Sequence, residues 1–350
     1  MDKISLIRDV VPFCSVVVLT VAWIFSSRPN ENIKAKTLLR KLNMYMEGFF
    51  FMVLSKDSKG LGPKKNPDPD EILGTQTTIK RIIFIRHGES EWNDIFNKGK
   101  DIGMLVRFLK AWYKEITFLF SMDSVFLDSQ LNLEGTTQAK ELGNYLESTE
   151  DSKLSEKERD IIKILRGESE TSVIVSSNLR RAISTTTIAL WPRIERTGEK
   201  IVILSSLQEV SRNVDTKTVT GYRTVPNLSR LADVLDKFGK PFLSENVFEV
   251  SENHGNKKSS FYGIKRLKAF NEWVFKRNED NIIVGGHSLW FKYFFQTFMP
   301  FKSNHVAKTQ KIANSGIVSF NLHRVELGDG PRYRIDPESI VVIYGGFTKK

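Results

Sequence analysis

The sequence contains almost no cysteine and lacks the signatures of the common nucleic-acid-binding domains. Cys14 is the single cysteine among 350 residues, which excludes disulfides within the chain and any cysteine-based metal cluster. We find no zinc-finger spacing, no Gly/aromatic RNA-binding signature and no heptad repeat behind a basic region. These absences fit a domain that faces the cytosol, and they argue against a nucleic-acid partner.

Negative charge is also in short supply. The chain has 41 acidic and 52 basic residues, which gives a net charge of +11. Such a balance suits anionic partners, such as phosphorylated ligands or an acidic membrane surface. With 40% hydrophobic and 27% charged residues, the chain has an ordinary globular composition and is long enough for one large domain or two small ones.

The N-terminus contains an uncharged run, Val10–Phe25, which reads VVPFCSVVVLTVAWIF. As a helix it is about 24 Å long, somewhat less than a hydrocarbon core of roughly 30 Å. A signal anchor is the favoured interpretation, while a cleaved signal peptide and a helix docked on the core stay open. Basic residues are more numerous after the run than before it. This bias predicts a single-pass protein whose large domain is cytoplasmic.

A second apolar segment, Thr37–Leu54, follows several basic residues. It can lie in the membrane interface or cover the folded domain as a helix, and both interpretations stay open. The next stretch, LGPKKNPDPDE, has the composition of a linker. We therefore expect an N-terminal membrane anchor and interfacial helix at 1–60, a linker at 61–76, and a folded domain at 77–350.

From residue 77 onward, strand-like and helix-like segments alternate. The expected strands are 81–85, 172–176, 200–205 and 281–285, and the expected helices are 136–146, 181–190, 261–275 and 289–298. This alternation predicts a three-layer α/β/α sandwich with a largely parallel central sheet. Two late strands, at 316–322 and 339–344, are expected to finish the sheet at an edge.

Polar side chains follow the predicted strands, where a parallel sheet binds its ligands. RHGES follows the first strand, SNLRR the second, LQEVSRN the third, and GHS the fourth. Two histidines, at least two arginines and a carboxylate are therefore expected at one edge of the sheet.

The motifs RHGESEWN, DSQLNLEGTTQA, SSNLRRAISTT and GGHS occur in this order. Together they resemble the histidine phosphatase superfamily, in its phosphoglycerate mutase-like branch, over residues 80–322. The resemblance implies hydrolysis of a phosphomonoester through a phosphohistidine, without a metal or cofactor. It implies a phosphorylated small molecule or a phosphoprotein as the substrate.

The same resemblance assigns roles to individual residues. His87 is implied to be the nucleophile, and His287 a second catalytic histidine that also contacts the phosphate. A planar guanidinium can hold two phosphate oxygens at once, which suits arginine to this site. The implied phosphate-binding residues are Arg86, Ser90, Asn93, Arg181 and His287.

The leaving alkoxide needs a proton, and Glu209 is at the position where many family members carry the general acid. In that role its pKa has to be raised by partial burial. Glu89 and Asp215 are the alternative donors, and the purely structural alternative is that Glu209 pairs with Arg212.

Two departures from the family pattern limit the functional prediction. LQEVSRNVD replaces the Glu-Arg-x-Tyr-Gly type segment of the mutases. This departure weakens the prediction of a phosphoglycerate mutase-like phosphotransferase, which stays as an alternative. A non-catalytic phosphate-binding scaffold at a membrane is the other alternative. An insertion at about 98–126 has apolar residues at helical spacing. It is expected to be a helix packed on the core, or else a lid or an apolar face for membrane or lipid-like substrate.

Overall fold

The computed structural model describes residues 32–62, 68, 77–96, 98–99, 102–168, 171–235, 243–258, 262–328 and 330–349. The expected anchor at 10–25 lies outside these residues, as does most of the expected linker. Across the described ranges, no helix combines the length and the apolar character needed to cross a membrane.

A mixed α/β fold surrounds a mostly parallel sheet, which in the described part of the chain has eight strands in the order β4-β3-β2-β5-β1-β7-β8, with β9 paired to β7. The strands are β1 (Thr78–Arg86), β2 (Ser172–Ser176), β3 (Ile201–Ile203), β4 (Phe248–Glu249), β5 (Asn281–Gly286), β7 (Ile317–Leu327), β8 (Gly330–Ile335) and β9 (Val341–Tyr344). β6 (Lys311–Ile312) and β10 (Phe347–Thr348) form a separate pair. The first five strands pair in parallel, so their carboxyl ends lie along one edge.

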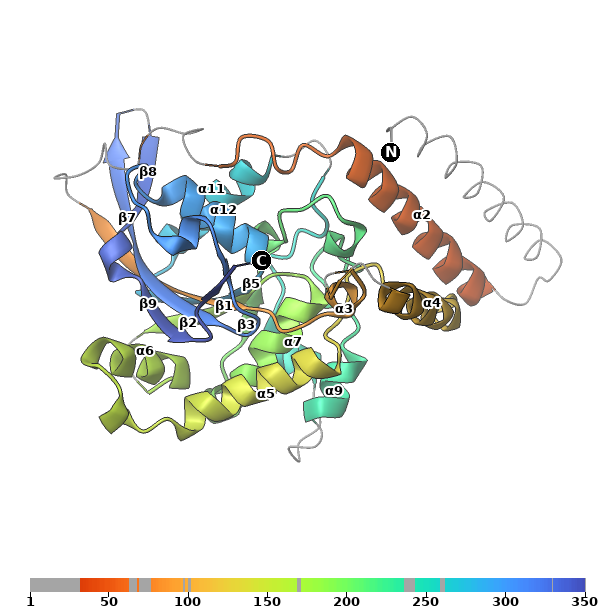
Figure 1. Cartoon of the computed structure of the whole chain (residues 1–350), viewed down its shortest axis with the longest axis horizontal. Coiled ribbons are helices and arrows are strands. Elements are labelled where there is room, and N and C mark those ends of the chain that lie inside the picture. The colour runs from red at the N-terminus through yellow and green to blue at the C-terminus, as the bar shows by residue number, and fades with distance from the viewer. Residues whose placement is uncertain are drawn as a thin grey trace.

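Helices cover both faces of the sheet (Figure 1). They are α2 (Asn32–Leu54), α3 (Glu91–Phe96), α4 (Ile102–Thr117), α5 (Leu133–Ser148), α6 (Glu156–Arg166), α7 (Arg180–Ala189), α8 (Trp191–Thr197), α9 (Ser229–Leu235), α10 (Ser244–Val247), α11 (Gly263–Lys276) and α12 (Ser288–Phe298). α11 and α12 pack on one face, and α5, α6 and α7 on the other. The predicted α/β sandwich is therefore present.

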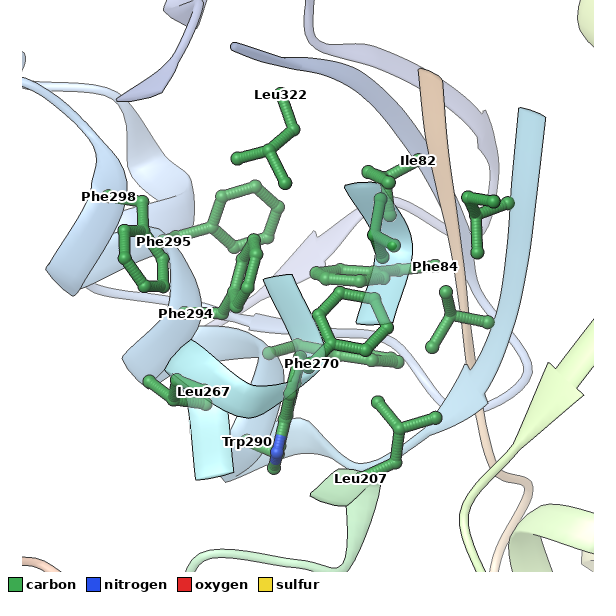
Figure 2. Packing of buried hydrophobic residues seen from close by; sticks show 14 of the residues in the cluster. Ile82, Phe84, Leu207, Leu267, Phe270, Trp290, Phe294, Phe295, Phe298 and Leu322 are labelled. Carbon is green, nitrogen blue, oxygen red and sulfur yellow. The ribbon is translucent and has the colours of Figure 1, made fainter. Parts of the chain in front are cut away.

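The alternation of side chains along β1 produces the two cores. Ile82 and Phe84 point into the cluster with α11 and α12, whereas Ile83 and Ile85 point into the cluster with α5 and α7. Figure 2 shows the first cluster, in which the Phe84 ring lies among aromatic side chains of α12. Phe84 stacks on Phe291 with ring centroids 4.0 Å apart. β1 is thus buried on both faces, as expected of a central strand.

The late strands do not simply finish the sheet at an edge. β7 lies between β1 and β8 and is antiparallel to both, and β9 also pairs with it. β8, which was not predicted, forms a hairpin with β7. Alternation of apolar residues marks a strand but does not say which strand lies beside it, so this neighbour could not be predicted.

α2 packs on the domain rather than standing apart from it. Leu38 and Phe51 are buried, and Lys41 forms a buried ion pair with Glu115 of α4 at 2.6 Å. A Cβ added at Gly48 would lie 3.1 Å from Val214, in the loop after β3. Of the two interpretations of this segment, the structure therefore shows the helix that covers the domain.

Candidate active site

His87 follows the last residue of β1 and is 4% exposed. Its backbone N–H donates to the Gly286 carbonyl at 3.0 Å, which joins the ends of β1 and β5. Its Nδ1 lies 2.6 Å from the Gly88 carbonyl oxygen. Because a carbonyl oxygen only accepts, Nδ1 carries the proton and Nε2 keeps its lone pair. Burial, with Arg181 and Arg86 nearby, holds the pKa of His87 well below 6.5, so the ring stays neutral.

His287 approaches His87 from the end of β5. The two ring centroids are 5.1 Å apart, although the residues are far apart in the sequence. Nε2 of His287 is hydrogen-bonded to the Ser177 hydroxyl at 2.8 Å. Nδ1 is buried and has no partner among the described residues. Burial lowers the pKa of His287 well below its usual value, so the ring is neutral.

Two buried arginines supply positive charge. Arg86 donates through Nη1 to the Ile312 carbonyl at 2.5 Å, and its buried Nε has no partner in the described part of the chain. Burial lowers the pKa of Arg86 to about 10, so it stays charged at neutral pH. Arg181, on the first turn of α7, donates to the Asp215 carbonyl at 3.0 Å and lies 3.3 Å from Oδ2 of the same residue. Both arginines are close enough to His87 to lower its pKa.

Glu209 lies at the start of α12 and not beside Arg212. Its Oε1 accepts from the backbone N–H of Trp290 at 2.8 Å and of Val210 at 2.9 Å. These backbone donors hold the carboxyl group of Glu209 at the N-terminus of α12.

Asp215 has the opposite surroundings. It is 5% exposed, and burial raises its pKa to about 6, with Glu209 adding to the rise and Arg181 opposing it. Its Oδ1 is buried without a partner among the described residues. Asp215 thus combines a raised pKa with an oxygen that has no partner among the described residues, whereas Glu209 is held by backbone donors.

Ser90 and Glu89 are hydrogen-bonded to neighbouring segments of the chain. The Ser90 hydroxyl accepts from the Asn93 backbone N–H at 3.3 Å, in the first turn of α3, where it acts as a helix cap. Glu89 Oε2 accepts from the Asn314 side chain. The structure therefore brings His87, His287, both arginines and Glu209 together. Ser90 directly precedes α3, and Asn93 lies in its first turn.

No protein-family model matches the chain, and no curated protein matches it. Solved structures do. They include phosphoserine phosphatase from Entamoeba histolytica (16% identity, 72% of this chain, 94% of that chain, TM-score 0.33). Mycobacterial glucosyl-3-phosphoglycerate phosphatase also matches (14% identity, 73% of this chain, 97% of that chain, TM-score 0.35). Phosphoglycerate mutase from Bacillus anthracis matches as well (16% identity, 74% of this chain, 92% of that chain, TM-score 0.36). The structural neighbours are histidine phosphatases and phosphoglycerate mutase-like proteins. The activity of this chain therefore has to be inferred from its own residues.

Sequence reasoning missed a cation network beside this site. Lys257 is buried and donates to the Glu209 carbonyl at 2.6 Å and to the Ser211 carbonyl at 2.8 Å. Its counter-ion is Asp57, at 2.9 Å, which also pairs with Arg266 at 2.6 Å. Asp57 follows α2, in a segment expected to lie outside the folded domain. No local motif marks Lys257 or Asp57, so only the fold could reveal them.

Close backbone contact explains a glycine of the first motif. A Cβ at Gly88 would lie 2.6 Å from the Gly135 carbonyl oxygen, and one at Gly135 would lie 2.0 Å from the Glu89 carbonyl oxygen. The first turn of α5 therefore packs directly against the chain that carries His87. At Gly88 the missing side chain makes room for this helix.

Arg180 points away from the site. It is fully buried and donates to the carbonyl oxygens of Asp128, Ser124 and Leu127. Asp128 in turn accepts from the Arg180 backbone N–H at 2.8 Å. This arginine holds the loop before α5 against α7, which leaves Arg181 to face His87.

Proposed function

We propose that this chain hydrolyses a phosphomonoester through a phosphohistidine on His87. The observation that carries the proposal is a neutral His87, with Nδ1 fixed by a carbonyl, that lies beside His287 and two buried arginines. Neutral imidazole with an available Nε2 is a competent nucleophile. Buried guanidinium groups stabilise the charge that develops on a transferring phosphoryl group.

The reaction has two steps. In the first, Nε2 of His87 forms a bond to phosphorus while the bond to the substrate oxygen breaks, and that oxygen receives a proton. In the second, water attacks the phosphorus, the bond to Nε2 breaks, and inorganic phosphate leaves. His287 Nδ1 and the two arginines hold the phosphoryl oxygens in both steps.

We propose Asp215 as the proton donor. Glu209 is already engaged by the backbone N–H groups of Trp290 and Val210. Asp215 has a buried oxygen without a partner in the described residues and pairs with Arg181. A protonated Asp215 can donate to the leaving oxygen and then take a proton from the attacking water. The sequence motif favoured Glu209, and that assignment stays the alternative.

The location of the activity is a separate proposal, which rests on the uncharged run at 10–25 and the basic residues after it. We propose a single-pass membrane protein whose catalytic domain is cytoplasmic. The substrate is a phosphorylated small molecule or a phosphoprotein, and no residue of the site separates these two classes.

The full chain with His87→Ala tests the reaction. We expect phosphate release from p-nitrophenyl phosphate, without added metal between pH 5 and 8, to fall by about 10³-fold or more in this variant. His254→Ala is the matched control, because His254 is exposed on a loop and its loss should leave the rate unchanged.

A trapping experiment separates hydrolysis from the alternatives. Acid-labile, base-stable labelling of the chain by a ³²P-phosphomonoester should appear with His254→Ala and not with His87→Ala. Labelling followed by transfer to a second substrate hydroxyl, in place of water, would identify a mutase. Binding of inorganic phosphate without turnover by the folded chain would identify a scaffold and refute the proposal.

A further inference from the structure

α4 presents an apolar face to solvent. Seven large hydrophobic side chains on this helix are between 45% and 83% exposed. They recur every three or four residues, which places them on one side of the helix. We call this set the apolar face of α4: Ile102, Leu105, Val106, Leu109, Trp112, Tyr113 and Ile116. Soluble proteins rarely leave a continuous apolar area of this size uncovered.

The helix cannot turn this face inward, because its other side is already engaged. Glu115 is buried, pairs with Lys41 of α2 at 2.6 Å, and accepts from the Val125 backbone N–H at 2.7 Å. Ala111 is buried beside Phe126. Rotating α4 to bury the apolar face would expel this carboxylate and leave the buried Lys41 without its partner, which is strongly unfavourable.

The exposed charge that α4 itself carries is basic. Glu115 is the single acidic residue of α4, and it is buried, whereas Lys110 is exposed. Figure 1 shows α2 beside α4 at the end of the molecule away from β8, and the Lys41–Glu115 pair joins the two helices. The first turns of α2 add Lys36 and Arg40, both exposed. Apolar side chains bordered by cations match the composition of a surface that binds anionic lipid.

The sequence before α2 also favours a membrane as the partner of this face. The uncharged run ends at Phe25, and residues 26–31 connect it to Asn32, the first residue of α2. Six residues span at most about 20 Å. A run that enters a bilayer would therefore keep the start of α2, and α4 beside it, close to the headgroups.

We propose that the apolar face of α4 inserts into the interface of an anionic lipid bilayer. Trp112 and Tyr113 are residue types that favour the headgroup region. A single convex helix offers no groove for a peptide, whereas a bilayer needs no complementary shape. Insertion would bring α3, and with it the segment after His87, to the lipid surface, because α3 packs on α4 through Phe96 and Phe108.

A local probe on the full chain tests this proposal independently of the N-terminal run. Cys14→Ser removes the native thiol, and Ile116→Cys then accepts an environment-sensitive dye at the apolar face. With vesicles of phosphatidylcholine and phosphatidylserine that contain brominated acyl chains, we expect the dye to be quenched. The matched label at Leu133→Cys should not respond, because Leu133 is an exposed side chain at the start of α5. Vesicles without phosphatidylserine, or high salt, should weaken the quenching.

Charge substitutions complete the test. The face variant replaces three members of the apolar face: Leu105→Glu, Leu109→Glu and Tyr113→Glu. The control variant replaces three exposed apolar residues elsewhere: Ile79→Glu, Tyr222→Glu and Leu243→Glu. Circular dichroism checks that both are folded. We expect vesicle-dependent quenching at position 116 to fall by about tenfold or more in the face variant and to persist in the control.

Three results would overturn the proposal. Equal quenching in the face and control variants would show that the N-terminus alone holds the chain at the membrane. A dye already shielded without vesicles would show that another segment of the chain covers the face. An unresponsive dye together with a concentration-dependent dimer would assign the face to a second copy.

Discussion

At the scale of single residues, the site depends on which hydrogen-bond positions are filled. The Gly88 carbonyl fixes the tautomer of His87, and burial keeps its ring neutral. Glu209 is held by backbone N–H groups, whereas Asp215 keeps a buried oxygen without a partner among the described residues. The contrast between these carboxyl groups gives a prediction about pH.

Asp215 has to be protonated to donate, and its pKa is raised to about 6. Hydrolysis of an alkyl phosphate should therefore decrease as the pH rises through about 6. Asp215→Asn should lower this rate by about 10²- to 10⁴-fold and abolish the decrease. Because p-nitrophenolate leaves without a proton, the same variant should lose much less activity with p-nitrophenyl phosphate.

Glu209→Gln is the matched control for this prediction. Its amide oxygen can still accept from α12, so the decrease above pH 6 should remain. If Glu209→Gln removes the decrease and Asp215→Asn preserves it, Glu209 is the donor. At neutral pH His87 should stay unprotonated in both variants, because burial holds its pKa well below 6.5.

At the scale of elements, α2 is tied to the active-site loop through the residues that follow it. Asp57 is 1% exposed and pairs with both Lys257 and Arg266. Burial raises the pKa of Asp57, but the two cations outweigh it and hold the pKa below its usual value. These cations also donate to the backbone on either side of Glu209. The N-terminal segment thereby fixes the loop that carries both carboxyl groups.

Asp57→Asn should destabilise the folded protein by about 3 kcal/mol or more, because it leaves two buried cations without their counter-ion. Urea unfolding at pH 7 measures the loss, and exposed Asp233→Asn should cost little. The folded pKa of Asp57 is depressed, so its contribution is present above the unfolded value and lost as the pH falls. The difference between wild type and variant should narrow below about pH 4. A constant difference would contradict the ion-pair explanation.

At the scale of the whole molecule, the candidate site lies at one edge of a buried sheet, and α4 lies at one end of the molecule (Figure 1). The exposed apolar side chains of α4 are therefore at that end. α2 covers the domain. A fragment that begins at residue 77 would therefore expose the surface that Phe51 covers, and it would lack Asp57. The boundary for a functional fragment therefore lies before Asn32, and not in the linker after α2.

Deleting residues 1–31 should move the protein from tightly bound to salt-extractable in a membrane fraction, because it removes the proposed anchor and keeps the apolar face of α4. The deletion should retain full phosphatase activity, since α2 and Asp57 remain. Fractionation with and without 1 M salt measures this, with the full chain as control. Retention that resists salt would contradict the single-anchor proposal.

The sequence by itself determined the α/β layers and the residues at the ends of the parallel strands. β2 has the predicted bounds, and His87, Arg181 and His287 converge as the motifs indicated. These features follow from local signals: apolar runs make buried strands, and parallel strands bring their carboxyl ends to one edge.

Tertiary structure alone decided the partners of these residues. The state of a carboxyl group depends on burial and on donors from distant elements, so Glu209 and Asp215 could not be distinguished from their spacing. The counter-ion Asp57 comes from beyond the expected domain boundary, about 200 residues from Lys257. Helical spacing also indicated the apolar face of α4, but it did not show whether that face points to the core or to solvent. The buried Glu115–Lys41 pair holds that stripe toward solvent.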